Sequence, residues 1–241
     1  MAEWLAIPGL ALALWQILVM ALDVPQWQLP GPWEILRAMV EDFASLRAHL
    51  LTTYGNVLMG FLLAVALGTG LALAIYFSSL VGLTLTPFIN IMCVVPVITV
   101  VPLLMLWLGF GREAKLVAVV AQSFPVINLN ALSAFSNVAG PRLELLRALR
   151  ASRFQTAIHC LLPSSIPGIF TGVKLAAVLA LIAEVTGEIS GGDAGLGAQT
   201  IKYTQYLKMP QAFACVFYVA AFGAIFYQSL GLIERWLTKD H

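Results

Sequence analysis

Residues 50–111 read LLTTYGNVLMGFLLAVALGTGLALAIYFSSLVGLTLTPFINIMCVVPVITVVPLLMLWLGFG and contain no Asp, Glu, Lys, Arg or His. A helix that crosses the hydrocarbon core of a bilayer needs about 20 such residues. The run is therefore too long for one helix, and it predicts two helices joined by a turn. Ser78, Ser79 and Gly82 near its middle, followed by Pro87, supply the turn residues.

Charge-free stretches recur along the rest of the chain. Hydrophobic residues make up 60% of the sequence and charged residues 10%, against about 45–50% and about 25% in soluble domains. The chain is therefore expected to be an all-α, polytopic membrane protein. The gaps between charged residues predict six transmembrane helices, at residues 5–22, 54–77, 86–108, 116–136, 167–187 and 211–232. An even number of helices places both termini on the same side.

The distribution of arginine indicates which side that is. Four arginines lie between positions 142 and 153, in the segment that joins the fourth and fifth predicted helices. Cytoplasmic segments carry an excess of Lys and Arg, so this segment and both termini are expected in the cytoplasm. The formal net charge of +1 provides no basic surface for nucleic acid.

The two longest segments on the opposite side differ in character. Residues 23–53 begin with a proline-rich piece and continue as an amphipathic pattern that fits a helix lying on the membrane surface. Residues 188–210 contain the glycines of GGDAGLG (191–197), but the strand that precedes a phosphate-binding loop is missing. A tight turn is expected there.

The segment at residues 138–166 predicts two short amphipathic helices that meet at a bend. Ser152 and Gln155 have the spacing of a capping box, which starts the second helix, and Pro163 and Pro167 are expected to end it. Such a pair of helices is suited to being held by another protein, and a solvated loop with helical character is the alternative. The apolar sides of the two helices comprise Leu145, Leu146, Leu149, Phe154, Ala157, Ile158 and Leu161.

Patterns typical of catalytic sites are missing from the sequence. The 3 histidines lie far apart, and no Gly-Lys dipeptide occurs, so the chain has no P-loop and is not itself an ATPase. The 3 cysteines fit small buried apolar residues better than metal ligands or disulfides. No cofactor or metal is expected on this chain.

Two ionisable residues, Lys174 and Glu184, lie well inside predicted helices. Both are near helix ends, so side chains that reach the interface are favoured over a place in a transport pathway. Pro96, Pro102 and Pro125 are expected to kink helices, and a kink around a solute cavity and a purely structural kink are equally open. The weakly charged interior mildly favours a neutral or aromatic solute over an anion.

Several motifs together resemble one family of transporters. ELLRALRASRF (144–154) and LPSSIPGIFTG (162–172) resemble the EAA loop of binding-protein-dependent ABC importer permeases. VPLLMLWLGFG (101–111), and the glycines and glutamate of residues 187–197, resemble the subgroup that transports nitrate, sulfonates, taurine and pyrimidine or riboflavin-like precursors. The resemblance extends over residues 50–236.

This resemblance implies a type I ABC importer permease fold with a cytoplasmic coupling-helix loop. In that family the loop sits in a cleft of a cytoplasmic ATPase dimer, which binds ATP and Mg²⁺. A second permease chain, by symmetry an identical one, and an extracytoplasmic solute-binding protein complete the importer in the bacterial inner membrane. The residues that the resemblance assigns to ATPase coupling are Glu144, Leu145, Leu146, Arg147, Leu149, Arg150, Ala151, Ser152, Phe154 and Pro163.

Two features depart from the family motif. Leu145 and Leu146 stand where two alanines are expected, a change that an amphipathic helix tolerates. Arg150 stands where the glycine of the family makes the bend. A non-glycine residue in the left-handed conformation costs about 1 to 2 kcal/mol, so the bend is expected to be either reshaped or strained.

The chain is expected to form a single permease domain over residues 1–241. It comprises an anchor helix and outer segment at 1–53, a permease core at 54–236 and the coupling loop at 138–166. A secondary, ion-coupled transporter or a channel subunit is the alternative, and the former would call for interior carboxylates or cations. A membrane enzyme would need a polar catalytic cluster. Of these alternatives, only an ABC importer permease requires a stable cytoplasmic ATPase partner.

Overall fold

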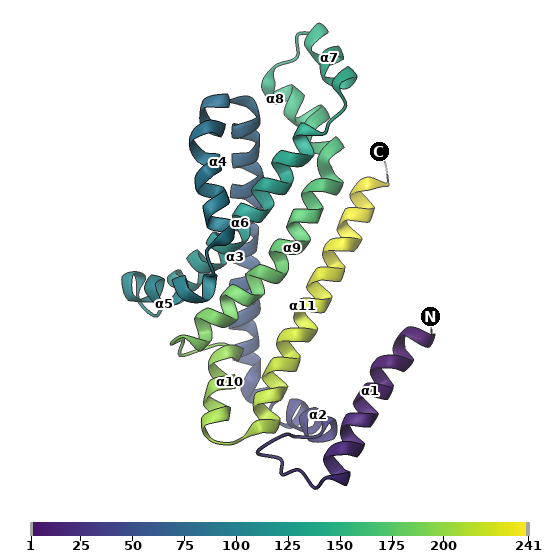
Figure 1. Cartoon of the computed structure of the whole chain (residues 1–241), viewed down its shortest axis with the longest axis vertical. Coiled ribbons are helices and arrows are strands. Elements are labelled where there is room, and N and C mark those ends of the chain that lie inside the picture. The colour runs from purple at the N-terminus through teal and green to yellow at the C-terminus, as the bar shows by residue number, and fades with distance from the viewer. Residues whose placement is uncertain (1, 240–241) are drawn as a thin grey trace.

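The computed structural model describes residues 2–239, and all regular secondary structure within them is helical. Four helical runs are long and apolar enough to cross a membrane, namely Phe43–Phe77, Arg112–Ser136, Arg153–Ile189 and Met209–Thr238, and they follow the long axis of the molecule (Figure 1). The elements in chain order are α1 (Ala2–Ala21), α2 (Pro32–Glu41), α3 (Phe43–Phe77), α4 (Ser79–Val94), α5 (Val97–Leu108), α6 (Arg112–Ser136), α7 (Gly140–Ala148), α8 (Arg153–Thr156), the π-helix η1 (Ala157–Leu161), α9 (Leu162–Ile189), α10 (Leu196–Gln205) and α11 (Met209–Thr238).

The helix expected at residues 86–108 is broken into α4 and α5. Val95 and Pro96 are both extended, and the helices on either side differ in direction by 108°. Proline disfavours a helical conformation in the residue before it, which explains why α4 ends at this point. α5 consequently leaves the bundle sideways (Figure 1). The bent pair adds at most one further span to the four continuous ones, and α1 contributes a shorter apolar helix over Gly9–Ala21.

The turn before α4 is tighter than the sequence predicts. Ser78 alone is extended, and its Oγ accepts a hydrogen bond from the amide of Val81 at 3.5 Å, in the manner of a helix N-cap. Ser79, Gly82 and Pro87, which were expected to form the turn, lie inside α4. A single capping serine is therefore sufficient to reverse the chain.

The amphipathic stretch within residues 23–53 does not form one surface helix. It divides at Asp42, and α3 begins at Phe43 rather than at residue 54, which gives a helix of 35 residues. Leu46 and Leu50 explain the early start, because both are buried and extend the core-facing side of α3 toward its beginning. The remaining long helices also extend beyond their predicted bounds by a few residues at their ends.

The core forms where α3, α6 and α9 pack against one another. Buried alanines and glycines bring their backbones close together, as is typical of helix interfaces in membranes. A Cβ at Gly60 would lie 2.6 Å from Val119 Cγ1, and one at Gly68 would lie 2.9 Å from the carbonyl oxygen of Phe124. Near the middle of α3, glycine is therefore required for contact with α6. Large apolar side chains cover the outside of the bundle, in agreement with a lipid environment.

Candidate functional site

The α7–α8 segment closes one end of the bundle, at the top of Figure 1. α7 ends at Ala148, and Arg150 follows with a φ of 56°, in the left-handed region. The amide of Ala151 donates to the carbonyl oxygen of Leu146 at 2.9 Å, which is the six-residue hydrogen bond of a glycine-type helix C-terminus. The bend was expected to be either reshaped or strained. The left-handed φ of Arg150 corresponds to the strained bend: the backbone follows the path typical of glycine, at a cost of about 1 to 2 kcal/mol.

The predicted capping box at the start of α8 is confirmed. The amide of Gln155 donates to Ser152 Oγ at 3.2 Å, and the amide of Ser152 donates to Gln155 Oε1 at 2.7 Å. These reciprocal bonds fix the direction in which the chain leaves the bend. The bend and the cap together hold α7 and α8 in a defined mutual orientation.

The expectation that Pro163 and Pro167 end this second helix is wrong. The chain passes from α8 through the π-helix Ala157–Leu161 directly into α9, which holds Pro163 in its first turn and Pro167 in its interior. The amide of Leu162 donates to the carbonyl oxygen of Ala157, five residues back. This wide turn gives Pro163 room, because its ring would otherwise meet the carbonyl of the preceding helical turn. The second helix of the loop and a membrane span are thus one helical run, Arg153–Ile189.

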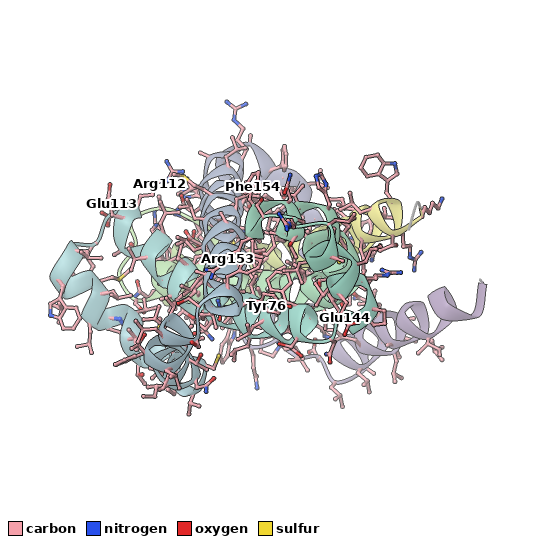
Figure 2. The ribbon with its side chains drawn as sticks, turned by 90° about the horizontal axis from the view of Figure 1, so that it is seen from above. Tyr76, Arg112, Glu113, Glu144, Arg153 and Phe154 are labelled. Atoms are coloured by element: carbon pink, nitrogen blue, oxygen red, sulfur yellow. The ribbon has the colours of Figure 1, made fainter. Side chains whose placement is uncertain are left out.

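Three apolar side chains form an exposed surface on this segment, which we name the loop patch: Leu145, Leu149 and Phe154. They are 62%, 69% and 73% exposed, because they lie beyond the packed part of the bundle. Figure 2, viewed onto this end, shows Phe154 next to Arg153, with Glu144 also on this end. Leu146, Ala151 and Pro163 are partly buried and support the loop from behind, while Arg147 lies within α7. An exposed apolar surface at a fixed bend is typical of a protein interface.

A buried cluster of charged residues lies at the opposite end of α9. The expectation that Glu184 reaches the interface is wrong, since it is 0% exposed, and Glu188 one turn later is 1% exposed. Glu188 Oε1 accepts from Thr53 Oγ1 at 2.7 Å, and Glu188 Oε2 accepts from the amide of Gly197 at 2.8 Å. Glu184 Oε1 accepts from Asn56 Nδ2 at 2.8 Å. These bonds join α9 to α3 and to the first turn of α10.

Lys115 of α6 supplies a cation to this cluster. It is 5% exposed, and its aliphatic chain packs so closely on Gly187, between the two glutamates, that a Cβ there would lie 2.9 Å from Lys115 Cγ. Its Nζ donates to the carbonyl oxygen of Ala194 at 3.4 Å. Lys115 forms no ion pair with either glutamate, but its buried positive charge partly offsets theirs, since uncompensated charges in a membrane bundle are costly. By the orientation expected from the sequence this end is the outer one, and we call Thr53, Asn56, Lys115, Glu184 and Glu188 the outer cluster.

Of this cluster, sequence reasoning named Glu184 as a weak pathway residue and Glu188 only as part of a motif that resembles the permease subgroup. It placed Lys115 and Glu188 in outer segments, whereas both are buried within the bundle. The available signal was helical spacing: Glu184 and Glu188 are four residues apart, and Thr53 and Asn56 are three apart, so each pair shares a helix face.

The remaining ionisable and proline positions do not converge on one site. Lys174 pairs with Glu234 of α11, and both side chains are partly buried. Pro96 lies at the break before α5, Pro102 is exposed on α5, and Pro125 is buried inside α6. An apolar cavity of about 750 Å³ lies between α3, α4 and α6, and Phe124, the neighbour of Pro125, lines it.

Known proteins resemble the chain in sequence and in fold. The model of the family described as binding-protein-dependent transport system inner membrane component matches residues 56–239. The taurine transport system permease protein of Escherichia coli is 26% identical, over 94% of this chain and 85% of the relative. The riboflavin transport system permease protein of Chloroflexus aurantiacus is 28% identical, over 95% and 87%.

A solved structure of the MetNI methionine ABC transporter in an inward-facing conformation contains a chain of the same fold. The TM-score is 0.62 at 20% identity, and the match covers 88% of this chain and 99% of the other. The fold, the family match and the bend between α7 and α8 all fit a permease of an ABC importer. This multi-pass membrane protein therefore belongs to the binding-protein-dependent transport system inner membrane components, the permease subunits of ABC importers.

Proposed function

We propose that this chain is the permease subunit of an ATP-driven importer for a small solute. The solute belongs to the class of nitrate, sulfonates, taurine or pyrimidine and riboflavin-like precursors, which fits relatives named for taurine and riboflavin transport. Two copies of the chain form the pathway, and a soluble binding protein delivers the solute from outside. ATP and Mg²⁺ bind to a cytoplasmic ATPase dimer, because this chain has no P-loop.

The observation that carries this proposal is the loop patch on the rigid α7–α8 bend. In this role Leu145, Leu149 and Phe154 enter a cleft of the ATPase, and the charged residues Glu144 and Arg150 belong to the same contact. Leu146, Ala151, Ser152 and Pro163 hold the bend in shape. Because α8, η1 and α9 are one helical run, movement of the ATPase passes directly to a membrane span.

The outer cluster is the one observation that favours an ion-coupled transporter, since buried carboxylates are typical of such proteins. Copurification distinguishes the two. We expect affinity-purified permease, expressed with its chromosomal neighbours, to retain an ATPase subunit, and uptake into vesicles to require ATP inside. Uptake driven by an ion gradient without an ATPase subunit would contradict the importer.

We place the α7–α8 loop and both termini in the cytoplasm, which the arginine-rich loop supports. Single cysteines at the exposed positions Asp193 and Arg153, in a Cys93→Ser background, test this orientation. In cells stripped of their outer barrier, an impermeant thiol reagent is expected to label Asp193→Cys and to leave Arg153→Cys unlabelled until the membrane is opened. Labelling of Arg153→Cys in sealed cells would reverse the orientation.

A further inference from the structure

A small pocket lies between α3 and the first residue of α6. Its volume is about 310 Å³, and Leu51, Thr52, Gly55, Asn56 and Arg112 line it. Further along the same two helices lies the apolar cavity of about 750 Å³, lined by residues 63–74 of α3 and 116–124 of α6. Both hollows thus lie along the same pair of helices, and Thr52, Asn56 and Arg112 give the smaller one its polar groups.

Arg112 is held in a fixed orientation beside this pocket. Its Nε donates to Asn56 Oδ1 at 2.8 Å, and its Nη2 contacts Met59 Sδ at 3.2 Å. Asn56 is itself fixed, because its Nδ2 donates to the buried Glu184 at 2.8 Å and only its oxygen is left to face the arginine. The outer cluster thus orients a guanidinium through one buried amide.

The charge of Arg112 is not matched by a carboxylate. Among the side chains that the structure describes, the ion pairs join Arg37 to Glu41 and Lys174 to Glu234, and none includes Arg112. A guanidinium has five N–H donors, and the two hydrogen bonds described leave most of them free. Gly55 opposite leaves open space, since no atom lies within 4 Å of where a Cβ would stand. Arg112 is exposed, and Figure 2, viewed from the α7–α8 end, shows it at the edge of the bundle.

We propose that this pocket binds the oxyanion group of the transported solute, a sulfonate, nitrate or carboxylate, through Arg112. Asn56 and Glu184 are positioning residues that aim the guanidinium. A preorganised planar fork suits an oxyanion because it offers two parallel N–H donors. The proposal rests on the importer function and departs from the neutral solute that the composition favours.

Site-directed modification tests the pocket without any ATPase, so its outcome is independent of the importer assignment. The full chain carries Gly55→Cys in a Cys93→Ser background and is reconstituted in phosphatidylcholine vesicles, while Cys160 and Cys215 are buried. The measured quantity is the ratio of modification rates for an anionic, sulfonate-bearing methanethiosulfonate and a cationic, trimethylammonium-bearing one. Thr52→Cys, which lines the same pocket, replaces Gly55→Cys if that variant misfolds.

We expect Arg112→Gln to lower this ratio about three- to tenfold, as the loss of one nearby charge should at moderate ionic strength. Methanesulfonate should slow modification of the parent protein. Asn56→Ala should retain the charge-dependent ratio and weaken protection by methanesulfonate, because the guanidinium is no longer aimed. Arg37→Gln, which removes an exposed cation on α2, is the matched control and should change neither quantity.

Two results would overturn the proposal. One is a ratio that is the same for Arg112→Gln and for Arg37→Gln. The other is slower modification when the chain is reconstituted in vesicles that contain phosphatidylglycerol, together with no protection by free methanesulfonate. That result would assign the pocket to a lipid headgroup.

Discussion

A permease in which Phe154 and Leu149 are both replaced by alanine is expected to insert normally and to lose its ATPase partner. In the free chain these side chains are 73% and 69% exposed, so their truncation removes little internal packing. We expect affinity for the ATPase to fall at least about tenfold, because a central interface anchor contributes about 2 kcal/mol or more and about 1.4 kcal/mol is a factor of ten. Titration of purified ATPase onto the permease in nanodiscs measures the dissociation constant directly.

The matched control for this prediction is Trp107→Ala. Trp107 is 75% exposed, as Phe154 is, but it lies on α5, far along the chain from the loop patch. ATPase affinity should be unchanged in this variant. If the double variant keeps full affinity and normal stimulation of hydrolysis, the α7–α8 loop is not the ATPase contact.

The second large effect is expected at Lys115. Lys115→Met keeps most of the volume of the side chain and removes the cation that partly offsets the charge of Glu184 and Glu188. No ion pair joins Lys115 to either glutamate, so the loss of stability should stay below the cost of breaking a buried pair, about 3 to 5 kcal/mol. The bundle should nevertheless unfold at lower denaturant, because two buried carboxylates lose the nearest buried cation. The measurement is equilibrium unfolding in mixed micelles, followed by circular dichroism.

Two further variants show whether charge balance is the cause. Lys202→Met removes an exposed lysine from α10 and should have little effect. Adding Glu188→Gln to Lys115→Met removes one of the uncompensated carboxylates and should restore part of the lost stability, as a double-mutant cycle would report. Equal stability of Lys115→Met and Lys202→Met would show that the buried lysine does not stabilise the bundle.

Local features could be predicted from the sequence with good accuracy. The gaps between charges located the apolar helices, because the cost of burying a charge in lipid acts on each residue separately. The spacing of Ser152 and Gln155 predicted a capping box that the structure contains. The bend at Arg150 was also anticipated, because backbone conformation at a helix end depends on a few neighbouring residues.

Features that depend on distant partners were missed. Glu188 and Thr53 are 135 residues apart in the chain, and no local pattern shows that they form a hydrogen bond. Lys115 and Glu188 lie near helix ends, where a charge usually marks the start of a loop, yet neighbouring helices bury both. The 108° break at Pro96 likewise depends on the packing of α5 against α6 and α9, whereas proline alone predicts only a kink.

The length of α3 gives the bundle the properties of a lever. A helix of 35 residues is about 52 Å long at about 1.5 Å per residue, which exceeds the hydrocarbon thickness of about 30 Å. One of its tight contacts with α6, at Gly60, falls at the midpoint of that length, where it can serve as a pivot. Any tilt about this point swings the two ends of α3 in opposite directions, so one small rotation widens one mouth of the groove while it narrows the other.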